Sequence, residues 1–262
     1  MRNRHWKSTA AICGALLIAA GGTGSAAVPT PVQHRPAMDW PALPVFPIAG
    51  RIVVLDPGHN GGGGAHPDEI NAQVPDGRGG MKPCNTTGTN ANDGYSEHEF
   101  NWVLAQQVRD LLTARGIQVV MSRDNDTGWG PCVDERGTLG NRVGAAAVVS
   151  IHADGAPEGD HGFHVAYSSP AVNDAQGDPS IRLATALRDG LDGKGFTESN
   201  YVGSHGLDPR ADLAGLNFAT VPAALVECGN MRDSGDIAML ESPDGRARLA
   251  ASLADAITAY IG

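Results

Sequence analysis

Continuous apolar runs alternate along the chain with longer stretches of helical periodicity. Apolar runs bounded by Gly, Pro or Asp predict buried strands at residues 52–55, 117–121, 147–151, 162–167 and 223–226. Apolar positions spaced three or four residues apart predict helices at 97–114, 139–145, 179–191 and 245–261. This alternation predicts a single α/β domain, in which a twisted, mostly parallel β-sheet is flanked by helices on both faces.

The helix predicted at 97–114 has the clearest boundaries. Ser96 precedes it and Glu99 follows three residues later, so the two side chains are expected to form a capping box with the first turn. Apolar residues fall on one face of this helix, and Gly116 follows its last turn. We therefore expect the helix to pack one face against the sheet.

Two segments lack any regular pattern. Residues 60–94 are rich in Gly, Asn, Asp and Pro, which predicts a long loop. A loop of this length inside a domain is usually functional or cross-linked. Residues 28–50 contain six prolines and are expected to form an extended linker or strap. The globular domain is therefore predicted over residues 51–262.

The first 27 residues have the pattern of a signal peptide. Three basic residues precede an apolar run at 9–20, and small residues at 24–27 offer a cleavage site. The apolar run is shorter than the roughly 20 residues that span a membrane, although an uncleaved anchor is the alternative. We expect export to the periplasm, cell wall or exterior, with no stable membrane insertion after cleavage.

Composition narrows the possible partners. The formal net charge is −10, and removal of the three basic residues in 1–27 would make it −13. A protein this acidic has no general basic field for nucleic acid, so nucleic-acid binding is not expected. Sixteen of the 19 basic residues are Arg, and Ala and Gly are abundant, which suggests a GC-rich genome. We expect the protein to be monomeric.

Three cysteines follow the predicted signal peptide. Cys84 and Cys132 lie in polar, Gly-rich stretches that predict loops, whereas Cys228 follows an apolar run. In an oxidising compartment an odd number of cysteines leaves one thiol free. We expect a Cys84–Cys132 disulfide and a buried Cys228, with redox sensitivity of Cys228 as the alternative.

Candidate chemistry gathers at the ends of three predicted strands. His59, His152 and Glu227 each follow an apolar run, and the carboxyl ends of strands are where open α/β sheets bind ligands. Glu97, in the first turn of a helix, is a fourth candidate. Two imidazoles and one carboxylate match a catalytic zinc site with an open position, and the remaining carboxylate can act as general base and acid.

Each of these residues also has a structural interpretation. Glu97 can satisfy the N-terminus of its helix, and Glu227 can form an ion pair with Arg136 or Arg123. A single histidine in a turn is most often a solvated polar residue, as expected for the chain's other histidines. From the residues alone, the metal site and these structural roles remain open alternatives.

The motifs around these residues resemble one family, the zinc-dependent N-acetylmuramoyl-L-alanine amidases. The family's first strand ends in D-P-G-H-x-G, which is present here at 56–61. The further matches follow in order along the chain: the helix start at 97–101, S-R-x-x-D at 122–126, Arg136 and Asn141 ahead of S-I-H-A at 150–153, G-F-x-V-x-Y-S at 162–168, and P-A-x-L-V-E at 222–227.

The resemblance implies a reaction and assigns roles. It implies that Zn²⁺ is held by His59, Glu97 and His152, with Glu97 rather than Glu99 as the ligand. Glu227 would be the catalytic base and acid. The reaction would be hydrolysis of the amide between N-acetylmuramic acid and L-alanine in peptidoglycan or muropeptides. Residues 228–231 and the length of the 60–94 segment depart from the family pattern.

The sequence leaves open which residues support the metal ligands or contact the substrate, and it leaves alternative functions open. Arg136 is expected to hold Glu227, a substrate carboxylate or a structural partner. Asn141 and His205 are further candidates for supporting the ligands or contacting substrate. The same ligand set also serves a zinc peptidase or a carbohydrate deacetylase acting on the same polymer. A cell-wall-binding protein without catalytic activity is the remaining alternative.

Overall fold

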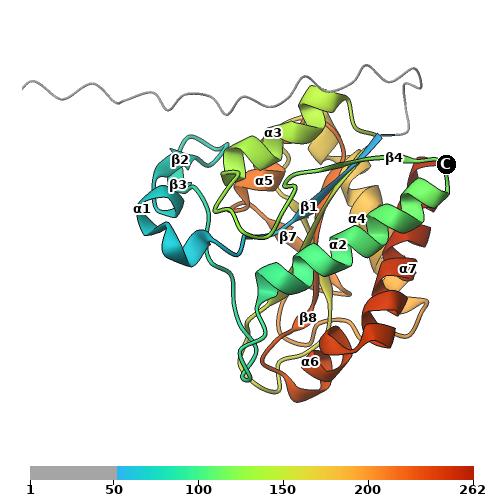
Figure 1. Cartoon of the computed structure of the whole chain (residues 1–262). Coiled ribbons are helices and arrows are strands. Elements are labelled where there is room, and N and C mark those ends of the chain that lie inside the picture. The colour runs from blue at the N-terminus through green and yellow to red at the C-terminus, as the bar shows by residue number, and fades with distance from the viewer. Residues whose placement is uncertain (1–51) are drawn as a thin grey trace, which may run out of the picture. The chain divides into compact units, whose positions relative to one another are not determined.

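The computed structural model describes residues 52–262, which contain a six-stranded sheet in the order β4-β1-β5-β8-β6-β7 (Figure 1). All neighbouring strands are parallel except β6 and β8, which are antiparallel. The mostly parallel α/β architecture predicted from the sequence is therefore confirmed. The strands are β1 (Ile52–Pro57), β4 (Gln118–Met121), β5 (Ala147–Asp154), β6 (His164–Ser168), β7 (Leu207–Arg210) and β8 (Ala223–Asn230).

Helices cover both faces of this sheet (Figure 1). One face packs against the long helices α2 (Glu97–Ala114), α4 (Asp178–Asp192) and α7 (Pro243–Ile261), and it carries the larger apolar core. The other face packs against α3 (Val133–Val143) and α5 (Ala214–Asn217) around a smaller core. The face packed by α3 and α5 is therefore covered by shorter helices and a smaller apolar core than the other face.

Two strands extend beyond the apolar runs that predict them. The runs at 147–151 and 223–226 continue into β5 and β8, which end at Asp154 and Asn230. His152 and Glu227 consequently lie within strands rather than after them. The sequence pattern ends the strands early because the polar residues in these positions face the candidate site instead of the apolar core.

The other differences from the predicted elements have local causes. Helix α3 begins at Val133 rather than at 139, because its first turns pack through Gly137, where a Cβ would lie 2.8 Å from the carbonyl oxygen of Gly215. Ser96 precedes α2 but its side chain makes no capping hydrogen bond, so the predicted capping box is wrong. Strand β7 and helix α5 are short and have few apolar residues, and the apolar residues of helix α6 (Ser234–Glu241) are consecutive rather than spaced three or four apart.

The sequence predicts a long loop at 60–94, but the structure contains regular elements in this segment. It contains a 3₁₀ turn (Gly63–Ala65), helix α1 (Pro67–Ile70) and an antiparallel hairpin of β2 (Gln73–Pro75) and β3 (Met81–Pro83). No helix within 52–262 is both long and apolar enough to cross a membrane. The predicted signal peptide (1–27) and linker (28–50) lie outside the described residues.

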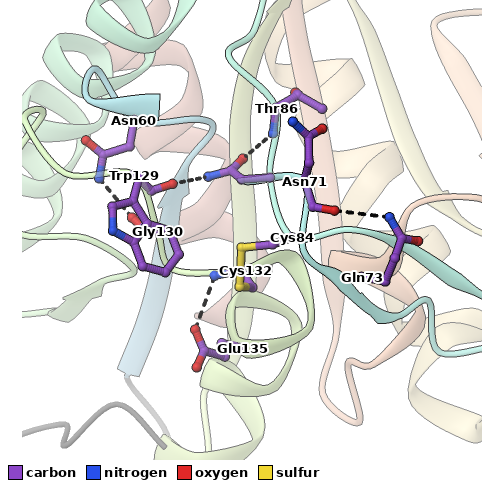
Figure 2. Close-up of a disulfide and its surroundings, with 10 residues drawn as sticks. Asn60, Asn71, Gln73, Cys84, Thr86, Trp129, Gly130, Cys132 and Glu135 are labelled. Carbon is purple, nitrogen blue, oxygen red and sulfur yellow. Dashed lines mark hydrogen bonds between the residues drawn. A yellow bond between two sulfur atoms is a disulfide. The ribbon is translucent and has the colours of Figure 1, made fainter. Parts of the chain in front are cut away.

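A disulfide joins Cys84, just after β3, to Cys132 at the start of α3 (Figure 2). Neighbouring hydrogen bonds reinforce this connection: the Asn85 side-chain amide donates to the Trp129 carbonyl oxygen (3.0 Å), and the Val133 amide donates to the Cys84 carbonyl oxygen (2.8 Å). The pairing predicted from the sequence is therefore present. Cys228 is a free, buried cysteine, and burial raises the pKa of its thiol.

Replacing both Cys84 and Cys132 with Ser is expected to lower the free energy of unfolding by about 2–4 kcal/mol. The unfolded chain regains the freedom that closure of a loop of 48 residues removes. Urea titration of the variant, and of the wild type with and without a reductant, measures the effect. Identical unfolding midpoints for the oxidised and reduced wild type would contradict it.

Candidate active site

Three side chains from separate segments converge on one point. His59 comes two residues after β1, Glu97 is the first residue of α2, and His152 lies in β5. One potential ligand atom from each lies within 4.8 Å of the others. Glu97 Oε1 is 3.1 Å from His59 Nε2 and 2.9 Å from His152 Nδ1, and the two rings are nearly perpendicular. This arrangement could hold one metal ion, as the sequence suggested.

Backbone groups orient two of these side chains. His59 Nδ1 lies 2.9 Å from the Thr86 carbonyl oxygen, an acceptor, so Nδ1 carries the proton and Nε2 is left as the coordinating atom. The Thr89 amide donates to Glu97 Oε2 (2.9 Å), which leaves Oε1 facing both imidazoles. Such contacts fix the tautomer and direction of a metal ligand. Both partners come from the 60–94 segment, so that segment supports the site.

The protonation states suit a cation. Burial alone would raise the pKa of Glu97, but the closeness of the His59 and His152 imidazoles lowers it well below its usual value. Burial lowers the pKa of His152. The site therefore offers an ionised carboxylate together with an imidazole that stays neutral near pH 7, the forms in which these groups bind metal.

Two glycines allow the ligands to approach the backbone closely. A Cβ on Gly58 would lie 2.1 Å from His152 Cε1. A Cβ on Gly88, whose φ is +79°, would lie 2.7 Å from Glu97 Oε2 and 2.8 Å from His59 Cδ2. His59 itself has a φ of +60°, which is unusual for a residue with a side chain. Side chains at positions 58 and 88 would therefore collide with the three candidate ligand side chains.

The Gly58→Ala variant is expected to bind zinc about 10–100-fold more weakly, the range seen when groups that support a metal ligand are changed. The added methyl group would displace the His152 ring. Competition against a chromophoric chelator measures the affinity. Gly64→Ala is the matched control, since a Cβ there has nothing within 4 Å. Equal affinities for Gly58→Ala and the wild type would exclude this role for Gly58.

Glu227 lies beside the metal-ligand cluster on β8. It is in register with His152 on β5 and with His164 on β6, so the three side chains project from the same face of the sheet. Its Oε2 atom is shielded from solvent and has no hydrogen-bond partner among residues 52–262. Burial, followed by the negative charges of Glu97 and Asp154, raises its pKa well above the usual value. A raised pKa makes the ionised carboxylate a stronger base than an ordinary glutamate, which suits a group that transfers protons.

The two arginines considered as partners of Glu227 have other partners. Arg136 makes a two-pronged ion pair with Asp56, at 2.7 and 2.9 Å, and Asp56 also accepts hydrogen bonds from Ser122 and Ser150. Arg123 pairs with Asp126. Of the roles considered for Arg136, the structure shows the structural one, an ion pair with Asp56, and not a pairing with Glu227.

Asn141 and His205 are held by contacts outside the cluster. The Asn141 side chain donates to the Phe218 carbonyl oxygen (2.8 Å) and accepts from the Thr220 amide (2.7 Å), which fixes the connection between α5 and β8. His205 is exposed in the turn before β7, has a φ of +51°, and its carbonyl oxygen accepts from Arg188. Neither residue contacts a candidate ligand in these hydrogen bonds.

Sequence reasoning missed one residue of this site, His164. It is buried, its Nδ1 has no partner within the described chain, and its Nε2 lies 4.0 Å from Asp208 Oδ2. Its place beside Glu227 depends on the antiparallel pairing of β6 with β8, which the sequence does not reveal. The alternating pattern of the 162–168 strand places His164 on one face but cannot say which strand lies next to it.

Comparison with known proteins places this geometry in a family. The family model for N-acetylmuramoyl-L-alanine amidases matches residues 53–259. The chain is 46% identical over 214 residues to an N-acetylmuramoyl-L-alanine amidase of Mycobacterium tuberculosis, covering 82% of this chain and 88% of the relative.

Two solved structures have the same fold. The amidase Ami1 of Mycobacterium smegmatis is 50% identical with a TM-score of 0.79, covering 82% of this chain and 98% of its own. The apo form of Ami1 from Mycobacterium abscessus is 51% identical with the same TM-score, covering 82% of this chain and 100% of its own. Sequence, fold and site geometry agree, and the chain belongs to the N-acetylmuramoyl-L-alanine amidase family.

Proposed function

We propose that the protein is a zinc-dependent hydrolase that cleaves the amide between N-acetylmuramic acid and L-alanine in peptidoglycan or its fragments. In this proposal His59, Glu97 and His152 hold the ion, and Glu227 transfers protons. The observation that carries the proposal is the convergence of the three ligand atoms within 4.8 Å, next to a carboxyl group whose Oε2 has no hydrogen-bond partner in the described chain.

The donor set fits Zn²⁺. Two imidazole nitrogens and one carboxylate oxygen are the ligands of catalytic zinc sites, which keep a further position open. The short distances from Glu97 Oε1 to both imidazoles bring three donors together around a position that a cation would stabilise. When bound, the ion supplies Lewis acidity to the scissile carbonyl group and to a water molecule.

The protein's own groups would then carry the proton transfers. Glu227 takes a proton from the attacking water and returns it to the nitrogen of the leaving alanine. The raised pKa of Glu227 supports both steps, because a carboxyl group with an ordinary pKa is a poor proton donor at neutral pH. Since Glu227 and His152 are in register, the proton carrier is close to the ligand cluster.

The location of the substrate supports export. Peptidoglycan lies outside the cytoplasmic membrane, which agrees with the signal peptide predicted at 1–27 and with a disulfide in the catalytic domain. We propose that the mature protein acts in the periplasm, cell wall or exterior as a monomer. Size-exclusion chromatography with light scattering tests the oligomeric state.

Digestion of purified muropeptides, followed by mass spectrometry, tests the reaction. We expect intact stem peptides and peptide-free glycan, and we expect both to disappear after treatment with a chelator and to return on addition of Zn²⁺. Shortened stem peptides would indicate a peptidase, and released acetate would indicate a deacetylase. A zinc-loaded protein that binds the wall but releases no product would be a binding protein.

A further inference from the structure

A cleft opens beside the ligand cluster on the sheet face covered by α3 and α5. Its cavity has a volume of about 180 Å³, and His59 and His152 form part of its wall. One side is formed by residues 82–86, next to the disulfide, and the opposite side by residues 213–216. The floor is formed by Val148 of β5 and Leu225 of β8. Any molecule in this cleft therefore touches the proposed metal ligands.

Most of the cleft lining consists of aliphatic side chains, and its charged side chains make contacts with other parts of the protein. Aliphatic side chains form most of it, namely Val133, Val148, Leu213, Leu216 and Leu225. Of its charged groups, Asp56 and Arg136 neutralise each other in a buried ion pair. Lys82 donates from Nζ to the Asp212 carbonyl oxygen (2.7 Å), and burial lowers its pKa. An uncharged aliphatic occupant suits the aliphatic part of this cleft, where a charged one would lose hydration.

The position of Leu225 identifies which part of the substrate enters. Leu225 lies two residues before Glu227 on β8, and both side chains project from the same face. Under the proposed function, Glu227 protonates the leaving nitrogen, so the residue that carries this nitrogen must lie near Glu227. Its side chain is then within reach of Leu225, which lines the cleft.

We infer that the cleft is the binding site for the side chain of the first stem-peptide residue, and that it accepts uncharged aliphatic side chains larger than the methyl group of alanine. The inference rests on the proposed function and adds its substrate range. A cavity of about 150 Å³ lined by aliphatic and aromatic residues can hold benzene, so the volume here exceeds what one methyl group occupies.

Gly215 provides a direct way to fill the cleft. It lies in α5 and lines the cavity, and a Cβ added to it has nothing within 4 Å. The Gly215→Leu variant therefore adds a side chain at the wall of the cleft without a clash at its first atom. Gly64→Leu is the matched control, because Gly64 has the same open surroundings but does not line the cavity.

The test uses synthetic N-acetylmuramoyl amides whose first residue is Gly, Ala, Val, Leu or Asp. For the wild type we expect kcat/KM with Val and Leu to remain within about tenfold of Ala, and Asp to fall at least about 100-fold, because its charge would be buried unpaired. In Gly215→Leu, kcat/KM for Val and Leu should fall at least about tenfold, while the Gly amide changes little. Gly64→Leu should match the wild type.

Several results would overturn the inference. One is rejection of Val and Leu as strongly as Asp by the wild type. Another is an equal loss on all five amides in Gly215→Leu with its zinc and fold intact. Gly215→Ala serves if the larger substitution prevents folding, and the Leu amide should then be the most affected. If the zinc-loaded wild type cleaves none of the amides, Ala included, the proposed function fails and this inference fails with it.

Discussion

Glu227→Gln is expected to lower kcat by about 10²–10⁴-fold, the usual contribution of a general acid–base group. The amide side chain keeps the size of the carboxyl group but cannot accept the proton of the attacking water. Glu227 is not one of the three residues whose ligand atoms converge, so the variant should bind zinc with wild-type affinity. Its Oε2 makes no hydrogen bond in the described structure, so little local structure depends on it.

Turnover of a muropeptide, zinc content and the thermal melting curve should be measured together for this variant and for Glu227→Ala. Glu99→Gln is the matched control, since Glu99 is an exposed carboxylate two residues from the proposed ligand Glu97. The control should have wild-type kcat. Turnover of Glu227→Gln within tenfold of the wild type, with zinc bound, would exclude proton transfer by this residue.

Arg136→Leu is expected to lower the free energy of unfolding by about 3–5 kcal/mol, the cost of removing one partner from a buried ion pair. The carboxylate of Asp56 is buried beneath α3, and its remaining partners would be the hydroxyl groups of Ser122 and Ser150. Arg109→Leu is the control, because Arg109 pairs with Asp110 at the surface, where ion pairs contribute little. An equal effect of the two substitutions in urea titrations would contradict this role.

Measuring the free energy of unfolding of Arg136→Leu and of the wild type at several pH values tests the same ion pair in a second way. In the wild type, burial would raise the pKa of Asp56, but the charge and hydrogen bonds of Arg136 lower it far below its usual value. The pair therefore stabilises the fold fully above the unfolded-state pKa, and this contribution is lost progressively as the pH falls from that value to the lower, folded-state pKa. Without Arg136, burial raises the pKa, so the difference in stability between variant and wild type should begin to shrink at a pH above about 4, where Asp56 of the folded variant becomes protonated, and should keep shrinking as the pH falls further.

The sheet and the ligand cluster could be predicted because their sequence signals are local. The run before Asp56-Pro57-Gly58-His59 identifies both a strand and the residue delivered at its end. Helix α2 has the bounds that its periodicity predicts, which places Glu97 in its first turn. The parallel arrangement then brings the ends of β1, β5 and β8 to one edge.

The parts that could not be predicted depend on contacts between distant segments. Arg136 contacts Asp56, 80 residues earlier, and no local pattern separates this partner from Glu227. His164 meets Glu227 only because β6 runs antiparallel to β8. Helix α3 starts early because glycines replace an apolar face, and Ser96 does not cap α2, whose neighbour Glu97 instead accepts from the Thr89 amide.

The three ligand side chains come from positions 59, 97 and 152, so only the folded chain presents them together. A cation that binds this cluster must leave when the chain unfolds, and it raises the melting temperature in proportion to the logarithm of its concentration above the dissociation constant. At 100 times the dissociation constant, the gain is about 2.7 kcal/mol. A melting experiment without substrate can therefore rank divalent ions and report how fully a purified sample is loaded.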